Sequence, residues 1–228
     1  MTNFVAAGAP SSSVGDYLKA VWEVAGASGE AAGTSEVAAR LSVSAASVSN
    51  MFVRLQEMGL VEYERYRGAL LTDRGRREAL RLVRRHRLIE AFLLEHLSYS
   101  WEEVHEEAER LEHAVSDEFT ERLASFLGHP GHDPHGDPIP TATGALEPDD
   151  SFPLSEAEAG QRVKVFKVRD EDAAVLDYFG ERGLVPGKVL TVKETRKLDA
   201  VVTVEDENGE SFSFGQPLAS SIFVHVEP

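Results

Sequence analysis

Histidine and carboxylate side chains recur at helical spacing in the middle of the sequence. His86 and Glu90 lie four residues apart, and they therefore share one face of a helix. Four further residues share one face of a following helix: His105, Glu109, Glu112 and His113. Imidazole nitrogens and carboxylate oxygens gathered in this way are suitable ligands for Mn²⁺, Fe²⁺, Co²⁺, Ni²⁺ or Zn²⁺. We therefore predict a divalent metal site; the alternative is a solvated acidic helix face, because more glutamates flank His105.

A second set of polar residues has the character of a DNA-contacting surface. Ser44, Ser47 and Asn50 lie near the start of a helix predicted over residues 45–58. Small polar side chains at such a helix end can reach base edges or phosphates in a major groove. Three arginines are candidates for phosphate contacts: Arg54, Arg65 and Arg67. The alternative is that this part of the chain contacts only protein.

The first 74 residues contain the elements that position these polar side chains. Helix-start residues, apolar periodicity and strand alternation predict five elements: helices over residues 11–25, 34–41 and 45–58, and strands over residues 60–65 and 69–72. Tyr66–Gly68 forms the turn between the strands. Helix, helix, turn, helix and hairpin in this order predict a winged helix-turn-helix domain over residues 1–74.

The region over residues 75–147 is predicted to be helical and to carry the candidate metal ligands. One long helix is expected from Asp73 to about Leu97, and a second from about Ser100 to Leu127. Residues 128–155 are rich in Pro, Gly and Asp, and they are predicted to form loop and linker. The candidate ligands at His86 and His105 therefore lie on two neighbouring helices.

From Glu156 onward the pattern changes to short β segments. Five strands are predicted: residues 162–168, 189–194, 201–205, 211–214 and 222–226. Asn208–Gly209 is a strong hairpin signal, and one helix is expected over residues 172–182. Residues 148–228 are thus predicted to form a linker and an SH3-like β-barrel of the FeoA type. The expected fold class is multi-domain and mainly α, with a winged helix-turn-helix, a central helical domain and this C-terminal barrel.

The composition excludes several classes of protein. The chain has 228 residues, a net charge of −16 and no cysteine, which excludes iron–sulfur proteins, disulfide scaffolds and thiol enzymes. No apolar run approaches the roughly 20 residues that a membrane helix needs, and the first residues lack a basic secretory signal. A cytoplasmic protein without membrane contact is therefore expected. Phosphate-binding loops and nucleophile elbows are absent, so we do not expect an enzyme.

The negative charge is unevenly distributed. Residues 1–80 are nearly neutral, with 8 basic and 9 acidic side chains, and the excess of acid lies further along the chain. Nine arginines lie between Arg65 and Arg87, against only Asp73 and Glu78. An acidic protein repels phosphate as a whole, but a local basic stretch can still bind it. The net charge is therefore compatible with DNA binding by the first domain.

The order of these motifs resembles the diphtheria-toxin-repressor family of metal-dependent transcription regulators for iron or manganese. The resemblance covers about residues 12–228. It rests on the winged helix, RHRLIEAFL (residues 85–93), HEEAERLEHAVS (105–116), HGDPIP (135–140) and the C-terminal barrel. It implies a homodimer formed by the central helices, which makes residues 75–147 a metal-binding and dimerisation domain. It also implies binding to a double-stranded DNA operator.

The resemblance further implies two metal sites. Carried over by motif position, the primary site consists of four residues: Asp16, Glu109, Glu112 and His113. The ancillary site consists of His86, Glu90 and His105 together with a residue from the barrel. Asp172 is the best match for the barrel ligand, and Glu171 is the second.

The donor types bear on the choice of metal. Iron-type members of the family place sulfur residues in the primary site, whereas this chain has Asp16 and Glu109 there, as manganese-responsive members do. Manganese-type members commonly carry a second carboxylate one turn after Asp16, where this chain has Lys19, which argues against a closely bridged pair of ions. Glu90, His105 and the barrel resemble iron-type members. Carboxylates without sulfur favour Mn²⁺, with Fe²⁺ as the alternative.

Together these inferences predict a metal-dependent, DNA-binding transcription regulator of manganese or iron homeostasis. In this hypothesis a divalent ion bridges Asp16 to the central helices and orients the dimer toward successive major grooves about 34–36 Å apart. One alternative is a winged-helix regulator that senses an organic ligand. Another is a metal-dependent hydrolase, although the sequence shows no separate general base for it.

Overall fold

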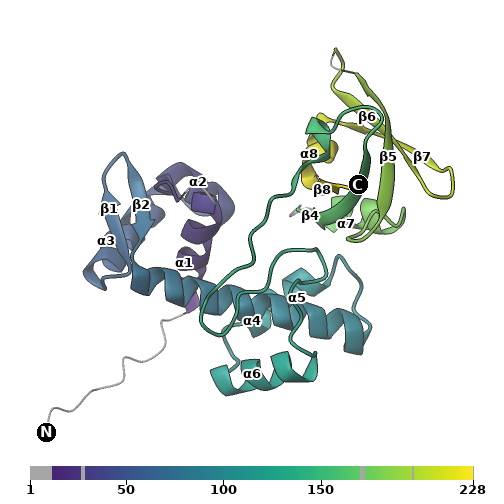
Figure 1. Ribbon diagram of the computed structural model, residues 1–228. Coiled ribbons are helices and arrows are strands. Elements are labelled where there is room, and N and C mark those ends of the chain that lie inside the picture. Colours follow the sequence, from purple (N-terminus) through teal and green to yellow (C-terminus); the bar gives the residue numbers. More distant parts are fainter. Residues whose placement is uncertain (1–11, 27–28, 170–172, 197, 228) are drawn as a thin grey trace, which may run out of the picture. The chain divides into compact units, whose positions relative to one another are not determined.

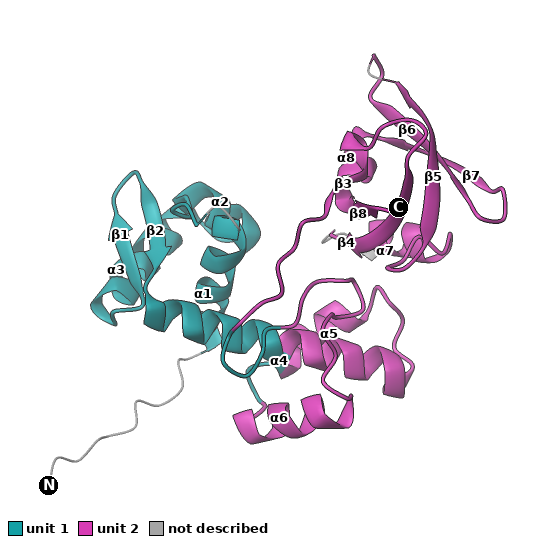
Figure 2. Ribbon diagram, viewed as in Figure 1, with its two compact units in different colours: residues 1–85, 112–114, 140–144 teal, residues 86–111, 115–139, 145–228 magenta. Residues whose placement is uncertain are grey.

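The computed structural model describes residues 12–26, 29–169, 173–196 and 198–227 (Figure 1). The chain divides into two compact units, each with hydrophobic core residues of its own (Figure 2). Unit 1 comprises residues 1–85, 112–114 and 140–144; unit 2 comprises residues 86–111, 115–139 and 145–228. None of the described helices has the length and apolar character needed to cross a membrane.

Unit 1 contains a helix-turn-helix. Three helices surround one apolar core: α1 (Ser12–Ala25), α2 (Thr34–Arg40) and α3 (Ala45–Glu57). α3 begins where the Ser44 side chain accepts a hydrogen bond from the backbone N–H of Ser47. Its inner face buries Val48, Phe52 and Leu55. The three helices predicted in this region are confirmed, because caps and apolar periodicity are local properties of the sequence.

The wing of unit 1 is a two-stranded hairpin. Its strands pair in antiparallel fashion: β1 (Val61–Glu64) with β2 (Gly68–Leu71). Ala32, which precedes α2, exchanges two backbone hydrogen bonds of 2.9 and 3.0 Å with Ala69 of β2. Gly68 permits this approach, because at its φ of +101° an added Cβ would lie 2.3 Å from the Ala32 carbonyl oxygen. The wing is therefore joined directly to the segment that leads into α2.

The central helices differ from the prediction at one point. α4 (Asp73–Leu97) has the predicted range, but the single helix expected over residues 100–127 is wrong. Two helices take its place: α5 (Val104–Leu111) and α6 (Asp117–Phe126). Ser116 explains the interruption, because its side chain accepts a hydrogen bond from the backbone N–H of Phe119 and so caps a new helix. Glu112 and His113 consequently lie in the turn that follows α5.

The C-terminal part of unit 2 is a six-stranded antiparallel sheet with the order β3-β8-β4-β5-β6-β7. Its strands are β3 (Phe152–Pro153), β4 (Arg162–Val168), β5 (Val189–Arg196), β6 (Val201–Asp206), β7 (Ser211–Gly215) and β8 (Ile222–Val226). The short helices are η2 (Leu154–Glu156, a 3-10 helix), α7 (Ala173–Gly180) and α8 (Gln216–Ser221). The five predicted strands are confirmed, whereas β3 and α8 were not predicted. Within the described residues β3 and β7 lie at the two edges of the sheet, so the closed barrel stays a prediction.

Candidate metal centre

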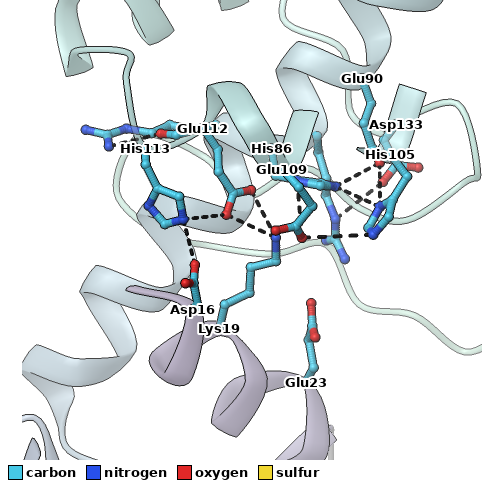
Figure 3. Close-up of polar contacts among 12 residues, drawn as sticks. Asp16, Lys19, Glu23, His86, Glu90, His105, Glu109, Glu112, His113 and Asp133 are labelled. Atoms are coloured by element: carbon cyan, nitrogen blue, oxygen red, sulfur yellow. Dashed lines mark hydrogen bonds and ion pairs between the residues drawn. The ribbon is translucent and has the colours of Figure 1, made fainter. Parts of the chain in front are cut away.

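Asp16, Glu112 and His113 come together in unit 1, and we name them the Asp16 group (Figure 3). Asp16 lies on α1, and His113 lies 97 residues further along in the turn that follows α5. His113 Nε2 is 2.6 Å from Asp16 Oδ1 and 3.5 Å from Glu112 Oε1. One ligand atom from each of the three residues lies within 4.8 Å of the others. Two segments distant in sequence thus present one small set of metal-ligating atoms.

A lysine ammonium is part of the same arrangement. Lys19 lies one helical turn after Asp16, and its Nζ donates to both carboxylate oxygens of Glu112, at 3.1 and 2.9 Å. The Lys19 and Glu112 side chains are only 7% and 0% exposed. A carboxylate in such a position is strongly destabilising without a partner, so the ammonium stabilises the ionised Glu112. This ion pair was not predicted from the sequence, in which Lys19 stands out only as a missing carboxylate.

Two contacts place the Asp16 group where α1 and the turn meet. Gly15 faces His113, and an added Cβ at Gly15 would lie 3.1 Å both from His113 Cε1 and from Leu82 Cδ2. A larger residue at position 15 would therefore crowd the imidazole. Arg85 Nη1 donates to the backbone carbonyl oxygen of Glu112 at 3.5 Å, which helps to hold the turn.

The second set of ligands lies in unit 2, and we name it the His86 group: His86, Glu90, His105 and Glu109 (Figure 3). His86 Nε2 is 2.8 Å from Glu90 Oε1 and 3.0 Å from His105 Nδ1. His105 Nδ1 is 3.1 Å from the same Glu90 oxygen. Glu109 Oε1 lies 3.9 Å from one nitrogen of each imidazole. Glu109, which the resemblance placed in the primary site, thus lies beside the two histidines of the ancillary site.

Glu90 is ionised inside the His86 group. Burial alone would raise its pKa, but the charge of His86 and hydrogen bonds with His105 and His86 hold the pKa well below its usual value. A buried anion of this kind needs a cationic partner, either a protonated imidazole or a metal ion. The local electrostatics therefore favour a cation between the two histidines.

A third cluster lies beside Glu90, in a segment that sequence analysis assigned to loop and linker. Asp133 and His135 are buried, and each has a ligand atom within 4.8 Å of one on Glu90. Asp133 Oδ1 accepts hydrogen bonds from the backbone N–H groups of His135 and Asp137, and His135 Nε2 lies 3.0 Å from the Trp101 carbonyl oxygen. Burial and the charge of Glu90 raise the pKa of Asp133 well above its usual value, and burial lowers the pKa of His135. Through these hydrogen bonds and the 3.4 Å contact between Arg87 Nε and Asp133 Oδ2, both side chains hold the loop. The HGDPIP motif was the sequence signal for this cluster.

The predicted DNA-contacting residues all lie exposed on unit 1. Four are at the start or on the outer face of α3, and two are in the turn of the wing: Ser44, Ser47, Asn50 and Arg54, then Arg65 and Arg67. The Ser44 and Ser47 hydroxyls lie 2.8 Å apart, so these serines also stabilise the start of the helix. Tyr66, between the two wing arginines, is almost fully exposed at a φ of +71°. The sequence predicted Tyr66 only as part of the turn between the strands.

The arginine-rich stretch between Arg65 and Arg87 has structural roles as well as a charge. Arg84 donates to the carbonyl oxygen of Pro140 at 2.8 Å, and Arg87 donates to that of Pro138 at 2.5 Å. These two guanidinium groups hold the loop that follows the third cluster. Part of the positive charge in this stretch therefore stabilises the protein itself.

The two groups could each hold a divalent metal ion. Ligand atoms bound at about 2.0–2.2 Å to one ion lie about 3 Å from each other. The distances of 2.6 and 3.5 Å in the Asp16 group agree with this spacing, as do the distances of 2.8 to 3.1 Å among His86, Glu90 and His105. Glu109 lies further from the two imidazoles, at 3.9 Å. Oxygen and imidazole nitrogen donors without sulfur suit Mn²⁺ and Fe²⁺. Asp172, the predicted barrel ligand, lies outside the described residues, as does Glu171.

Family models match three successive parts of the chain. Residues 11–69 match the N-terminal DNA-binding domain of iron-dependent repressors, and residues 72–141 match their metal-binding and dimerisation domain. Residues 152–226 match the FeoA domain. The described elements agree, so the chain has an N-terminal helix-turn-helix DNA-binding domain, a central helical domain and a C-terminal FeoA domain with an SH3-like sheet.

Individual proteins with these domains are similar over most of their length. The iron-dependent repressor IdeR of Mycobacterium tuberculosis is 35% identical over 172 residues, which cover 70% of this chain and 74% of that protein. The diphtheria toxin repressor of Corynebacterium glutamicum is 32% identical over 153 residues, or 65% and 67% of the two chains. A solved structure of a manganese-dependent transcriptional repressor in complex with manganese has a TM-score of 0.88 and 39% identity, and the match covers 94% of this chain and 100% of that one. The protein therefore belongs to the diphtheria-toxin-repressor family of metal-dependent transcription regulators.

Proposed function

We propose that this protein is a metal-dependent transcriptional repressor in which a divalent ion in the Asp16 group controls the position of the DNA-binding helices. One observation carries the proposal: Asp16 on α1 faces His113 across a sequence separation of 97 residues. α1 shares one apolar core with α2, α3 and the wing. A metal ion that joins α1 to the turn after α5 therefore also fixes α3, the helix proposed to enter the major groove.

The ligands have separate roles in this proposal. Asp16 provides the attachment on α1, whereas Glu112 and His113 provide it on the turn. The His86 group holds a second ion and supports the central helices. A bound divalent ion supplies the positive charge that offsets the repulsion between the Asp16 and Glu112 carboxylates. The conformation that binds DNA must bind the ion more tightly than the conformation that does not. If both conformations had equal affinity for the ion, metal would not change their populations.

The central helices are proposed to form a homodimer on a double-stranded DNA operator. Three large apolar side chains are exposed on α6 and at the end of α4: Phe119 (46%), Phe126 (65%) and Leu97 (52%). Phe126 adjoins Phe92 and His96 of α4, with ring centroids 6.0 and 4.8 Å apart, so the two helices present one apolar surface. A two-fold dimer built on this surface would place two α3 helices in successive major grooves about 34–36 Å apart.

Mn²⁺ is the metal that we propose, with Fe²⁺ as the alternative. Neither group contains a sulfur donor, and carboxylate-rich sites favour Mn²⁺ over softer metals. The similar proteins include both an iron-dependent and a manganese-dependent repressor. We also propose three functional domains, which cover residues 1–74, 75–147 and 148–228. The last is proposed to form a closed SH3-like barrel that provides Asp172 as a ligand to the His86 group. The proposed location of the protein is the cytoplasm.

Operator binding in the presence and absence of metal tests this function. A DNA site selected from a random-sequence library with Mn²⁺ present is titrated with protein in Mn²⁺ or in EDTA. We expect Mn²⁺ to tighten binding by roughly 10- to 100-fold, and Asp16→Ala to abolish that effect. Glu23→Ala is the matched control, because Glu23 also lies on α1 but pairs with Arg40 at 2.7 Å. Equal binding by the unmodified protein in Mn²⁺ and EDTA would contradict the proposal.

The size of the cavity beside His113 argues against an organic effector at this site. The cavity is lined by Ser12, Gly15 and Arg81 among others and measures about 130 Å³. Organic ligands of ordinary size occupy pockets of about 300 Å³ or more. A His113→Ala variant that kept its regulatory response would nevertheless favour the organic-ligand alternative.

A further inference from the structure

We propose that Tyr66, at the tip of the wing, is a further DNA contact whose hydroxyl donates a hydrogen bond to a backbone phosphate beside the base pairs that α3 reaches. This inference rests on the proposed DNA-binding function. It adds a residue to the polar candidates on α3 and the wing, and it gives that residue a role in the affinity for DNA and not in the recognition of its sequence.

The backbone at Tyr66 has a conformation that a tyrosine side chain disfavours. Its φ is +71°, in the left-handed region that glycine and asparagine adopt readily and bulky side chains rarely adopt. In the described part of the chain Tyr66 has the largest side chain among the non-glycine residues with a positive φ; the others are Ser42, Ser98, His129 and Ala200. Strained residues of this kind concentrate at functional sites. The strain therefore points to a role of Tyr66 other than stabilising the fold.

The Tyr66 side chain is not buried in return for this strain. It is 91% exposed, so the ring contributes little hydrophobic stabilisation. The guanidinium carbon of Arg65 lies 5.1 Å from the centroid of the ring. A cation–π contact at such an exposed site is weak. The ring and its hydroxyl are thus available to a binding partner.

The wing attaches Tyr66 to the helix that is proposed to enter the major groove. Tyr63 of β1 packs against the buried Phe52 of α3, with ring centroids 5.3 Å apart. Glu64 and Gly68 are paired in the hairpin, which leaves only residues 65–67 at the tip. A short tip on an attached hairpin loses little conformational entropy when it binds. Tyr66 can therefore contact DNA together with α3.

The charges around the tip favour a phosphate as the partner. Arg65 and Arg67 flank Tyr66 in the sequence, and all three side chains are exposed. Arg67 Nη1 lies 3.3 Å from Glu64 Oε2, so part of the positive charge of the wing is offset. Tyrosine hydroxyls are among the neutral donors that bind DNA phosphates, and such contacts position a protein without reading the sequence. The hydroxyl of Tyr66 is therefore suited to the DNA backbone.

Two substitutions in the full-length protein test this contact. Tyr66→Phe keeps the ring and the strain but removes the hydroxyl, whereas Tyr66→Asn removes the ring and introduces a residue that tolerates a positive φ. Ala200→Asn is the matched control, because Ala200 also has a positive φ, of +51°, but lies between β5 and β6. DNA affinity is measured in Mn²⁺ on the selected DNA site and on an unrelated duplex, and thermal unfolding is measured for each variant.

Tyr66→Phe is expected to weaken binding to the selected site by at least about threefold, and Tyr66→Asn by at least about tenfold. Tyr66→Asn should nevertheless melt about 2–4 °C higher than the unmodified protein, because the strain is relieved. Ala200→Asn should also melt at a higher temperature, but its DNA affinity should not change. The two losses of affinity should be the same on the unrelated duplex, because a phosphate contact does not depend on sequence.

Phosphate-ethylation interference locates the contact. One phosphate in each half-site should, when ethylated, hinder binding of the unmodified protein more than binding of Tyr66→Phe. Unchanged affinity of Tyr66→Phe for the selected site would overturn the proposal, as would a loss confined to that site. Failure of the unmodified protein to bind any DNA in Mn²⁺ would instead contradict the proposed function. The two failures therefore give different results.

Discussion

The Asp16 group and the His86 group use the same donor types, but they are assembled in different ways. The His86 group takes one i,i+4 pair from α4 and another from α5, and its buried carboxylate already faces two imidazoles. The Asp16 group joins a helix to a turn 97 residues away, and its buried carboxylate faces a lysine. A group on two neighbouring helices can stabilise a domain, whereas a group that joins distant segments can control how they are placed. In our proposal, connectivity more than ligand type therefore gives the Asp16 group its controlling role and the His86 group its stabilising role.

The largest expected effect concerns the buried carboxylate of the Asp16 group. Glu112→Gln in the metal-free protein should lower the free energy of unfolding by about 3–5 kcal/mol, because it breaks the buried ion pair between Glu112 and the Lys19 ammonium. Urea unfolding measures this loss, and the double variant with Lys19→Leu should recover much of it. Glu109→Gln in the His86 group is the control, since Glu109 is only half-buried and should change stability by less than about 1 kcal/mol. Equal losses of unfolding free energy in Glu112→Gln and Glu109→Gln would contradict the difference between the two groups.

A second pair of substitutions separates the role of the Asp16 group, which is proposed to control DNA binding, from that of the His86 group, which is proposed to stabilise the central helices. His113→Ala should eliminate the effect of Mn²⁺ on operator affinity, a loss of roughly 10- to 100-fold, because it removes the ligand that faces Asp16. His105→Ala should retain most of the effect, with a loss of about threefold or less. Both variants are measured as operator affinity in Mn²⁺ and in EDTA. A larger loss in His105→Ala than in His113→Ala would reverse the assignment.

The smallest expected effect concerns the loop that supports the His86 group. Burial alone would raise the pKa of Asp137, but Arg87, Arg169 and Lys167 lower it below its usual value. A carboxyl whose pKa is lower in the folded than in the unfolded protein stabilises the fold at pH above its unfolded pKa of about 4. This contribution is lost as the pH falls through the folded pKa.

Asp137→Asn should therefore cost about 1 kcal/mol of stability near neutral pH and should flatten the loss of stability on acidification. Urea unfolding of the metal-free protein between about pH 7 and pH 3 tests both effects. The Mn²⁺ affinity of the Asp16 group serves as the control and should not change. An unaltered acid slope in Asp137→Asn would show that this carboxyl does not support the loop.

The candidate ligands could be predicted from the sequence because helical spacing is a local property. His86 with Glu90, and His105 with Glu109, lie on single helices, and the structure brings each pair together. Helical spacing does not describe Glu112 and His113, because α5 ends at Leu111 and both residues lie beyond it. A serine followed by two acidic residues at position 116 was the overlooked signal for that interruption.

Contacts between distant segments could not be predicted in this way. The Lys19–Glu112 ion pair spans 93 residues, and no periodicity or cap encodes it. The buried Asp133 and His135 were missed for a related reason. Their Pro-, Gly- and Asp-rich surroundings correctly indicate a loop, but composition does not reveal what a loop packs against.

The two hydrogen bonds between Ala32 and Ala69 have a mechanical consequence for unit 1. They tie the wing to the lead-in of α2, and the shared core ties both to α1 and α3. We therefore expect a displacement of α1 at Asp16 to move α3 and the wing, with its exposed Tyr66, as one body. A side chain at Gly68 would clash with the Ala32 carbonyl oxygen and so loosen the connection between the wing and the segment that leads into α2.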